Sequence, residues 1–238
     1  MMEQGFFIEV GSSDWGTCIP LAKRGWKGII VEPLSEYLDN VERIDGVIYE
    51  NVGLSGTGGI REIVYFDMRK HTQKGKWLDE GIDYNREQDV HAFTGNQDEP
   101  ISKDEEKLAY ALWMRGLGTM VSRVYTEEHE HWMGEHPEMV ELHKRKFVKT
   151  ISLNSLIEKH WVRKIDFLKM DCEGMEHEII TNYDWSVKPR FIKMEYVHIN
   201  DGWDRHDKIN EQVAEVLDIL SSVGYMYWFE EKDIYAIL

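Results

Sequence analysis

Cysteine is scarce in this chain of 238 residues, which contains only Cys18 and Cys172. Two cysteines so far apart in the sequence do not form the dense disulfide framework of a small secreted protein. The scarcity of cysteine therefore favours a reducing compartment.

The chain also has fewer positively than negatively charged residues, and it has no long apolar run. Its 28 Lys and Arg residues face 44 Asp and Glu residues, which gives a formal net charge of -16. Such a balance argues against nucleic acid and anionic membrane surfaces, because both bind basic faces. The first apolar run, Phe6 to Val10, is too short for a signal peptide or a membrane span. We therefore expect a cytoplasmic protein that acts on a small-molecule or glycan acceptor; the sequence gives no indication of its oligomeric state.

What the chain does contain is the pattern of a globular α/β protein, and its length favours one domain over residues 1–238. Residues Phe6 to Val10 are apolar except for Glu9 and run into the turn Gly11 to Gly16. A helix is predicted from Cys18 to Arg24. A continuous apolar strand suits the centre of a parallel sheet, where ligands bind beyond the carboxyl ends of the strands. The turn is therefore the candidate cofactor-binding loop.

The composition of this loop limits which cofactor it can hold. Ser13 stands at the second glycine of a dinucleotide fingerprint, and Thr17 and Cys18 replace the Lys and Ser/Thr of a P-loop. A cofactor without phosphates fits better, and the carboxylate of Glu9 suits the ammonium group of S-adenosylmethionine. The alternative is a plain strand-to-helix turn without a ligand. The predicted cofactor contacts here are Glu9, Gly11, Ser12, Ser13, Gly16 and Thr17.

Two further strand ends are predicted to reach the same cofactor. The run from Lys27 to Val31 ends at Glu32 and Pro33, and an acid at this position can accept the ribose hydroxyls of an adenosine cofactor. The alternative for Glu32 is a solvated glutamate. A third strand ends at Asn51, near the adenine or the ribose.

The rest of the chain continues the alternation of strands and helices. Further strands are predicted at Ile60 to Phe66, Phe147 to Ser152, Lys164 to Met170 and Pro189 to His198, and helices at Ser35 to Arg43, Leu153 to Lys159, Met175 to Asn182 and Asp207 to Val223. Tyr225 to Phe229 and Asp233 to Leu238 are predicted to form an antiparallel hairpin. The fold class is α/β, with a doubly wound, mostly parallel sheet.

Residues of about 67–146 interrupt this pattern with polar, glycine-containing sequence. A segment of this length inside one domain is typical of a lid or a substrate-binding insertion. His129, His131 and His136 gather here. They lack cysteine partners and the helical spacing of a zinc protease, so surface histidines are favoured over a zinc site.

Four segments together resemble the FkbM-type methyltransferase family. They are Phe7 to Gly11, Val31 to Pro33, Asn51 to Ser55 and Ile165 to Glu176; the last places a lysine and then Asp-x-Glu-Gly-x-Glu after an apolar strand. The resemblance implies the class I methyltransferase form of the doubly wound sheet. It also implies S-adenosylmethionine-dependent methylation, usually of a hydroxyl on a sugar, glycan or natural product. The first loop departs from the family, because it reads Gly-Ser-Ser-Asp-Trp-Gly in place of a Gly-Ala-Asn type.

Methyl transfer from a sulfonium requires the protein to position donor and acceptor and to remove a hydroxyl proton. The strand ends place four candidate catalytic residues around the acceptor: Asp171, Glu173, Glu195 and His198. Of these, Asp171 is also a predicted cofactor contact. His198 is the candidate general base because its ordinary pKa lies nearest neutrality; a histidine bonded to backbone is the alternative.

Neighbouring carboxylates repel one another unless a proton or a metal ion intervenes. A divalent cation is therefore a further hypothesis, with Asp171, Glu195 and His198 as its ligands. Two other functions stay open at this point: a nicotinamide-dependent oxidoreductase and a non-catalytic binding module.

Overall fold

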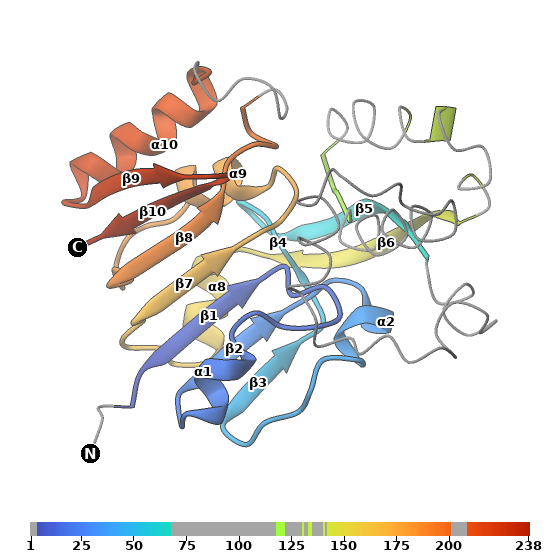
Figure 1. Ribbon diagram of the computed structural model, residues 1–238, viewed down its shortest axis with the longest axis horizontal. Helices are drawn as coiled ribbons and strands as arrows, with labels where there is room; N and C mark the ends of the chain where they lie inside the picture. The colour runs from blue at the N-terminus through green and yellow to red at the C-terminus, as the bar shows by residue number, and fades with distance from the viewer. Residues whose placement is uncertain are drawn as a thin grey trace, which may run out of the picture.

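The computed structural model describes residues 4–67, 118–121, 130, 133–134, 140, 142–200 and 209–238. In these ranges a seven-stranded sheet has the order β3-β2-β1-β7-β8-β10-β9 (Figure 1). Its strands are β1 (Phe6–Val10), β2 (Lys27–Val31), β3 (Val47–Glu50), β7 (Phe167–Met170), β8 (Phe191–Glu195), β9 (Met226–Glu230) and β10 (Asp233–Ile237). The first five are parallel to one another, whereas β10 runs antiparallel to both β8 and β9. The α/β class, the mostly parallel sheet and the carboxy-terminal hairpin are confirmed.

Helices cover both faces of this sheet because successive strand residues point to opposite sides. Phe7 packs with Ile19 beneath α1 (Ile19–Lys23) and α2 (Ser35–Leu38). Ile8 and Val10 belong to the larger core on the other face, under α8 (Leu153–Lys159), α9 (Glu176–Thr181) and α10 (Glu211–Ser222). In Figure 1, α1 lies in front of the sheet and α8 lies behind it.

The helix α10 illustrates how local sequence fixes an element. The side chain of Asn210 accepts a hydrogen bond from the backbone N–H of Val213 (2.9 Å) and caps the first turn. The buried residues of α10 follow the helical period: Val213, Val216, Leu217 and Leu220. No helix in the described ranges combines the length and the apolarity needed to cross a membrane.

A second, three-stranded sheet stands beside the first (Figure 1). It consists of β4 (Gly53–Leu54), β6 (His143–Ile151) and β5 (Gly59–Phe66), with β5 and β6 antiparallel. Phe66 pairs with His143 at one end of this sheet, and Thr119 exchanges two backbone hydrogen bonds with Val64 of β5 (both 2.9 Å). Most of the predicted insertion at 67–146, with His129, His131 and His136, lies outside the described residues, so its role stays a prediction.

Two predicted boundaries are corrected by the structure. The helix α2 ends at Leu38, well before Arg43. The strand β8 ends at Glu195, and the backbone then turns, because the N–H groups of Ile199 and Asn200 donate to the carbonyl of Tyr196 (3.0 and 2.9 Å). His198 therefore lies in this turn and not in the strand.

Candidate functional site

The loop after β1 is folded around the carboxylate of Glu9. The two oxygens accept hydrogen bonds from the backbone N–H groups of Thr17 (2.6 Å) and Cys18 (2.9 Å), and Glu9 is 0 % exposed. The carboxylate also places negative charge at the start of α1, where it is favourable. This geometry gives Glu9 a positioning role in the loop, and its predicted contact with an ammonium group stays a prediction.

Glu32, after β2, binds the same loop from the side. Its Oε2 accepts from the N–H of Ser13 (3.0 Å) and its Oε1 from the N–H of Leu34 (2.9 Å). Burial raises the pKa of Glu32 to about 8, although both N–H donors oppose the shift. Glu9 and Glu32 therefore face one loop, as a shared cofactor site requires.

The loop itself needs a left-handed backbone, with φ of 75° at Gly11, 49° at Ser13 and 66° at Gly16. A Cβ on Gly11 would lie 1.7 Å from the carbonyl oxygen of Asp171, so only glycine fits there. Ser13 is buried, and its hydroxyl has no hydrogen-bond partner among the described residues. The hydroxyl of Ser12 is used internally and donates to the carbonyl of Ser13 (3.1 Å). The loop thus contains a buried donor, the Ser13 hydroxyl, that no described residue uses.

The remaining predicted cofactor residues lie at the same edge of the sheet. The side-chain amide of Asn51 donates to the carbonyls of Glu32 (2.9 Å) and Pro33 (3.1 Å). This contact ties the end of β3 to the end of β2. The Thr17 side chain is exposed at the opposite end of the first loop.

Lys169 links the loop after β1 to the end of β7, a role that the sequence did not predict. Its Nζ donates to the carbonyl of Gly11 (3.0 Å) and lies 3.3 Å from Asp171 Oδ2 and 3.8 Å from Glu9 Oε1. Burial by itself would lower the pKa of Lys169, but the charges of Asp171 and Glu9 outweigh burial and raise it. A lysine inside the otherwise apolar strand β7 was the available signal.

The loop after β7 is held by Glu176, the last residue of the Asp-x-Glu-Gly-x-Glu motif, for which the sequence predicted no role. Its carboxylate accepts hydrogen bonds from the N–H groups of Cys172 and Gly174. Burial raises the pKa of Glu176 to about 7. Between those two residues, Glu173 adopts a left-handed φ of 51°, a conformation that side-chain-bearing residues rarely keep outside functional sites.

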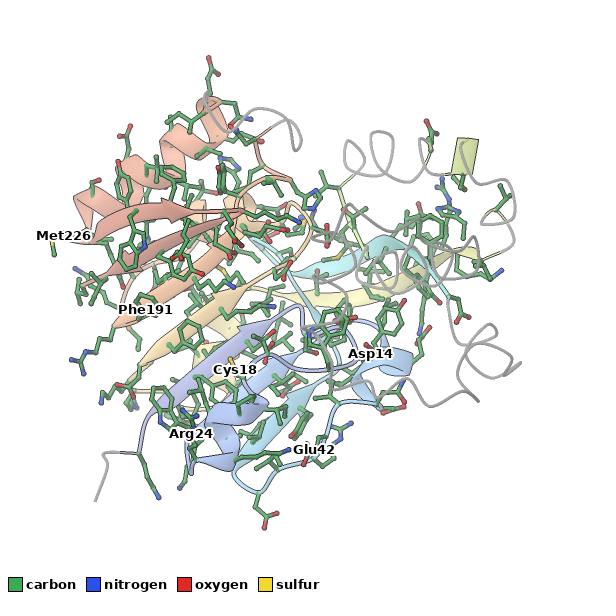
Figure 2. The ribbon with its side chains drawn as sticks, in the orientation of Figure 1. Asp14, Cys18, Arg24, Glu42, Phe191 and Met226 are labelled. Carbon is green, nitrogen blue, oxygen red and sulfur yellow. The ribbon has the colours of Figure 1, made fainter. Side chains whose placement is uncertain are left out.

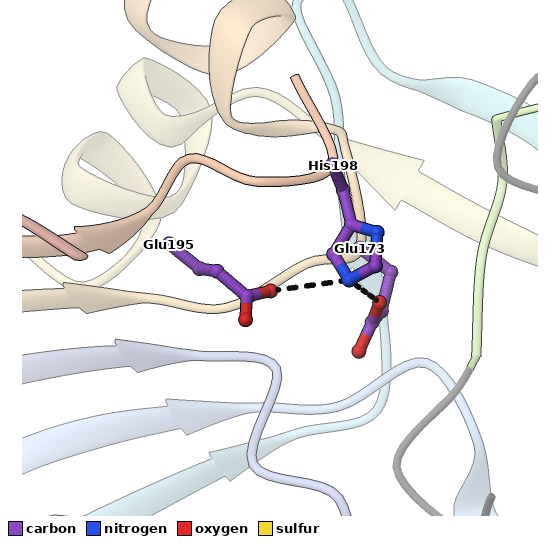
Figure 3. A group of neighbouring side chains, drawn as sticks. All are labelled: Glu173, Glu195 and His198. Atoms are coloured by element: carbon purple, nitrogen blue, oxygen red, sulfur yellow. Dashed lines mark ion pairs between the residues drawn. The ribbon is translucent and has the colours of Figure 1, made fainter. Parts of the chain in front are cut away.

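Three predicted catalytic side chains meet at this edge (Figure 3). Nε2 of His198 lies 2.7 Å from Glu173 Oε2 and 3.4 Å from Glu195 Oε2. His198 is 4 % exposed and Glu173 is 9 % exposed. Burial, together with the charges of Asp171 and Glu173, raises the pKa of Glu195 well above its usual range. We call Glu173, Glu195 and His198 the Glu-Glu-His cluster.

Asp171 has different surroundings from the Glu-Glu-His cluster. Its side chain is 41 % exposed and pairs with Lys169. The sequence-based metal hypothesis named Asp171, Glu195 and His198, whereas the potential ligand atoms that lie within 4.8 Å of one another belong to Glu173, Glu195 and His198. In the structure Glu173 thus takes the place of Asp171 in the candidate ligand set.

A pocket of about 700 Å³ opens beside this cluster. His198 and Gly174 form part of its wall, and residues of α9 and α10 form another part. Among the described lining residues, Glu178 and Glu211 carry negative charge and neither Lys nor Arg is present. The pocket therefore suits a neutral polar molecule better than an anion.

Parallel strands that end in a glycine loop and acidic side chains, next to a pocket, are typical of doubly wound α/β proteins. The family model described as "Methyltransferase FkbM domain" matches residues 6–227. The chain belongs to the FkbM methyltransferase family, as its motifs predicted. Comparisons with curated proteins and with solved structures gave no match.

Proposed function

We propose that this protein is an S-adenosylmethionine-dependent O-methyltransferase whose acceptor is a hydroxyl of a sugar, a glycan or a small natural product. Family membership supports methyl transfer. The strand order, with antiparallel β10 inserted between β8 and β9, supports the class I methyltransferase arrangement. Both features favour methyl transfer over a nicotinamide-dependent oxidoreductase.

The observation that carries the proposal is the junction of the first loop with the end of β7, where Gly11 touches the Asp171 carbonyl. The same loop carries the buried hydroxyl of Ser13, which has no hydrogen-bond partner among the described residues and can donate to the carboxylate of a bound amino-acid group. Glu32 would accept the ribose hydroxyls, since each of its oxygens has a further lone pair beyond its backbone bond. An adenosine cofactor would then lie across the ends of β1, β2 and β7.

The acceptor would occupy the pocket beside His198. Its hydroxyl oxygen attacks the methyl carbon in line with the departing sulfur: the O–C bond forms, the S–C bond breaks, and the electron pair stays on sulfur to give S-adenosylhomocysteine. The hydroxyl proton leaves toward the groups gathered there: Asp171, Glu173, Glu195 and His198.

Calorimetry with S-adenosylhomocysteine tests the cofactor assignment. We expect the wild-type chain to bind it and Glu32→Ala to weaken binding at least about tenfold, since a buried hydrogen-bond acceptor is lost. Glu42→Ala is the matched control, because Glu42 is an exposed glutamate paired with Lys23. Equal binding by wild type and Glu32→Ala, with both folded by circular dichroism, would contradict the assignment.

Mass spectrometry separates the remaining functions. Incubation of S-adenosylmethionine with a panel of sugars and phenols should yield a product heavier by one methylene group. Binding of NAD in place of S-adenosylhomocysteine would support the oxidoreductase, and binding of neither would support the non-catalytic module. The cytoplasmic location and the single domain with a lid stay predictions.

A further inference from the structure

We propose that the Glu-Glu-His cluster binds a divalent first-row transition cation that holds the hydroxyl of the acceptor. The proposal rests on the convergence of the Glu173, Glu195 and His198 ligand atoms beside the pocket. The role of the cation in methyl transfer depends on the proposed function. Cation binding itself does not.

The separations within the cluster match a shared ion. Two ligand atoms that each bind one cation at about 2.1 Å lie roughly 3 to 3.5 Å apart. The Nε2 atom of His198 lies 2.7 Å from Glu173 Oε2 and 3.4 Å from Glu195 Oε2. Figure 3 shows both carboxylates turned toward the same imidazole nitrogen. Small side-chain shifts would bring the three atoms onto one ion.

The carboxylates lack the hydrogen bonds that other glutamates of this chain make with histidine. Glu50 is hydrogen-bonded to His160 at 2.6 Å, and Glu215 to His177 at 2.8 Å. Glu173 Oε2 and Glu195 Oε2 are buried and accept no hydrogen bond from the described residues. Buried polar atoms are rarely left without a hydrogen bond, and both oxygens face the same imidazole nitrogen, as the ligands of one cation would.

Charge in the cluster points to the same conclusion. Glu173, Glu195 and the nearby Asp171 are acidic, and the described cation at this edge, Lys169, pairs with Asp171 and Glu9. Grouped carboxylates of this kind repel one another unless a proton or a cation lies between them. A divalent ion would supply it.

Three protein ligands leave coordination positions open, as in catalytic metal sites. Since His198 also lines the pocket, an open position would face the acceptor. One hydroxyl, or two neighbouring hydroxyls, of the acceptor would bind there. The cation would make the hydroxyl more acidic, and Asp171, which is not a ligand, would take the proton as the oxygen attacks the methyl group. His198 would then be a ligand and not the general base.

The donor set selects the type of cation. Carboxylate oxygens suit Mg²⁺, Ca²⁺ and Mn²⁺, whereas imidazole nitrogen suits the transition metals. Two carboxylates with one imidazole therefore suit Mn²⁺ or Zn²⁺ better than Ca²⁺. Mn²⁺ is the better probe because electron paramagnetic resonance distinguishes free from bound ion.

The test is a titration of the chelator-treated full chain with Mn²⁺, followed by electron paramagnetic resonance and calorimetry without cofactor or acceptor. We expect one high-affinity Mn²⁺ per chain, displaced by Zn²⁺ and not by an equal concentration of Ca²⁺. Glu173→Gln, Glu195→Gln and His198→Gln should each weaken binding about tenfold or more.

The matched control is Glu215→Gln, which alters an exposed Glu–His pair of the same chemistry and should leave Mn²⁺ binding unchanged. Absence of saturable binding, or equal binding by wild type and by folded Glu195→Gln and His198→Gln variants, would overturn the proposal. S-Adenosylhomocysteine binding, measured with chelator present, separates the two proposals. If the chain binds S-adenosylhomocysteine but not Mn²⁺, only the cation proposal is refuted. If it binds Mn²⁺ but not S-adenosylhomocysteine, the cofactor assignment is refuted.

Discussion

The loops after β1 and β7 are built alike and differ in one respect. Both follow buried parallel strands that pair with each other, and both close around a buried glutamate that accepts two backbone N–H groups, Glu9 in the first loop and Glu176 in the second. In the first loop each carboxylate oxygen of Glu9 and Glu32 accepts a hydrogen bond from a backbone N–H. In the second, the oxygens of Glu173 and Glu195 that face His198 accept none from the described residues.

The first loop therefore satisfies its own buried carboxylates, whereas the second loop does not. A loop whose charges are neutralised internally can bind a cofactor through its shape and its few spare donors. A cluster whose buried charges are unmatched needs a partner of opposite charge to be stable. The edge strand β9 lies far from either loop. Its Met226 is 73 % exposed and points away from the ribbon (Figure 2).

The largest expected effect comes from removing the contact between the two loops. Lys169→Met would leave Glu9 and Asp171 without their shared cation. Loss of one partner of a buried ion pair costs about 3 to 5 kcal/mol, so urea unfolding should show that decrease together with loss of cofactor binding. An unchanged unfolding midpoint would refute the bridging role of Lys169.

A smaller effect is expected from Gly11→Ala, where the new Cβ would lie 1.7 Å from a backbone oxygen at a φ of 75°. The overlap and the left-handed backbone together should cost about 2 to 4 kcal/mol. Gly25→Ala is the control, since Gly25 also has a positive φ but no atom within 4 Å of the new Cβ. It should cost about 1 to 2 kcal/mol. Equal losses measured by urea unfolding would show that the loops are not in close contact.

The two loops should respond with opposite sign to the same isosteric change. Glu9→Gln replaces an acceptor by a donor that faces a backbone N–H, which should cost about 1 to 3 kcal/mol. Glu195→Gln removes a carboxylate whose pKa is raised by burial and by like charges, so with chelator present it should leave stability unchanged or increase it. Thermal melts of both variants at pH 8 measure the contrast; destabilisation of equal size would remove the distinction drawn between the loops.

The last effect is a pH dependence that arises in the first loop and is spread over several pH units. Glu32 keeps its proton up to about pH 8 in the folded chain, whereas the unfolded chain releases it near 4.5, its ordinary value. Between these values the unfolded state binds fewer protons, so the Glu32 contribution makes stability fall as pH rises, by at most about 1.4 kcal/mol per pH unit. Denaturant unfolding at pH 5, 6, 7 and 8 should show a slope that Glu32→Gln reduces; an unchanged slope would assign the dependence to other groups.

Sequence reasoning recovered the elements with strong periodicity and missed contacts between distant segments. The strand β1 lies where its apolar run predicted it, and the hairpin of β9 and β10 is confirmed. The strand β6 begins at His143, earlier than predicted, because its first residues, His-Lys-Arg-Lys, hide the alternating pattern. His198 was placed in a strand because the apolar residues around it continue past Glu195, where the backbone actually turns.

The sequence by itself determined which strand ends carry acids and that the chain is an FkbM methyltransferase, since both depend on residues close together in the chain. Only the tertiary structure decided that Lys169 reaches Glu9, that Gly11 lies against Asp171, and that Glu173 joins Glu195 and His198. These contacts depend on β1 lying beside β7 and β7 beside β8. Strand order and register set such distances, and no local pattern of residues encodes them.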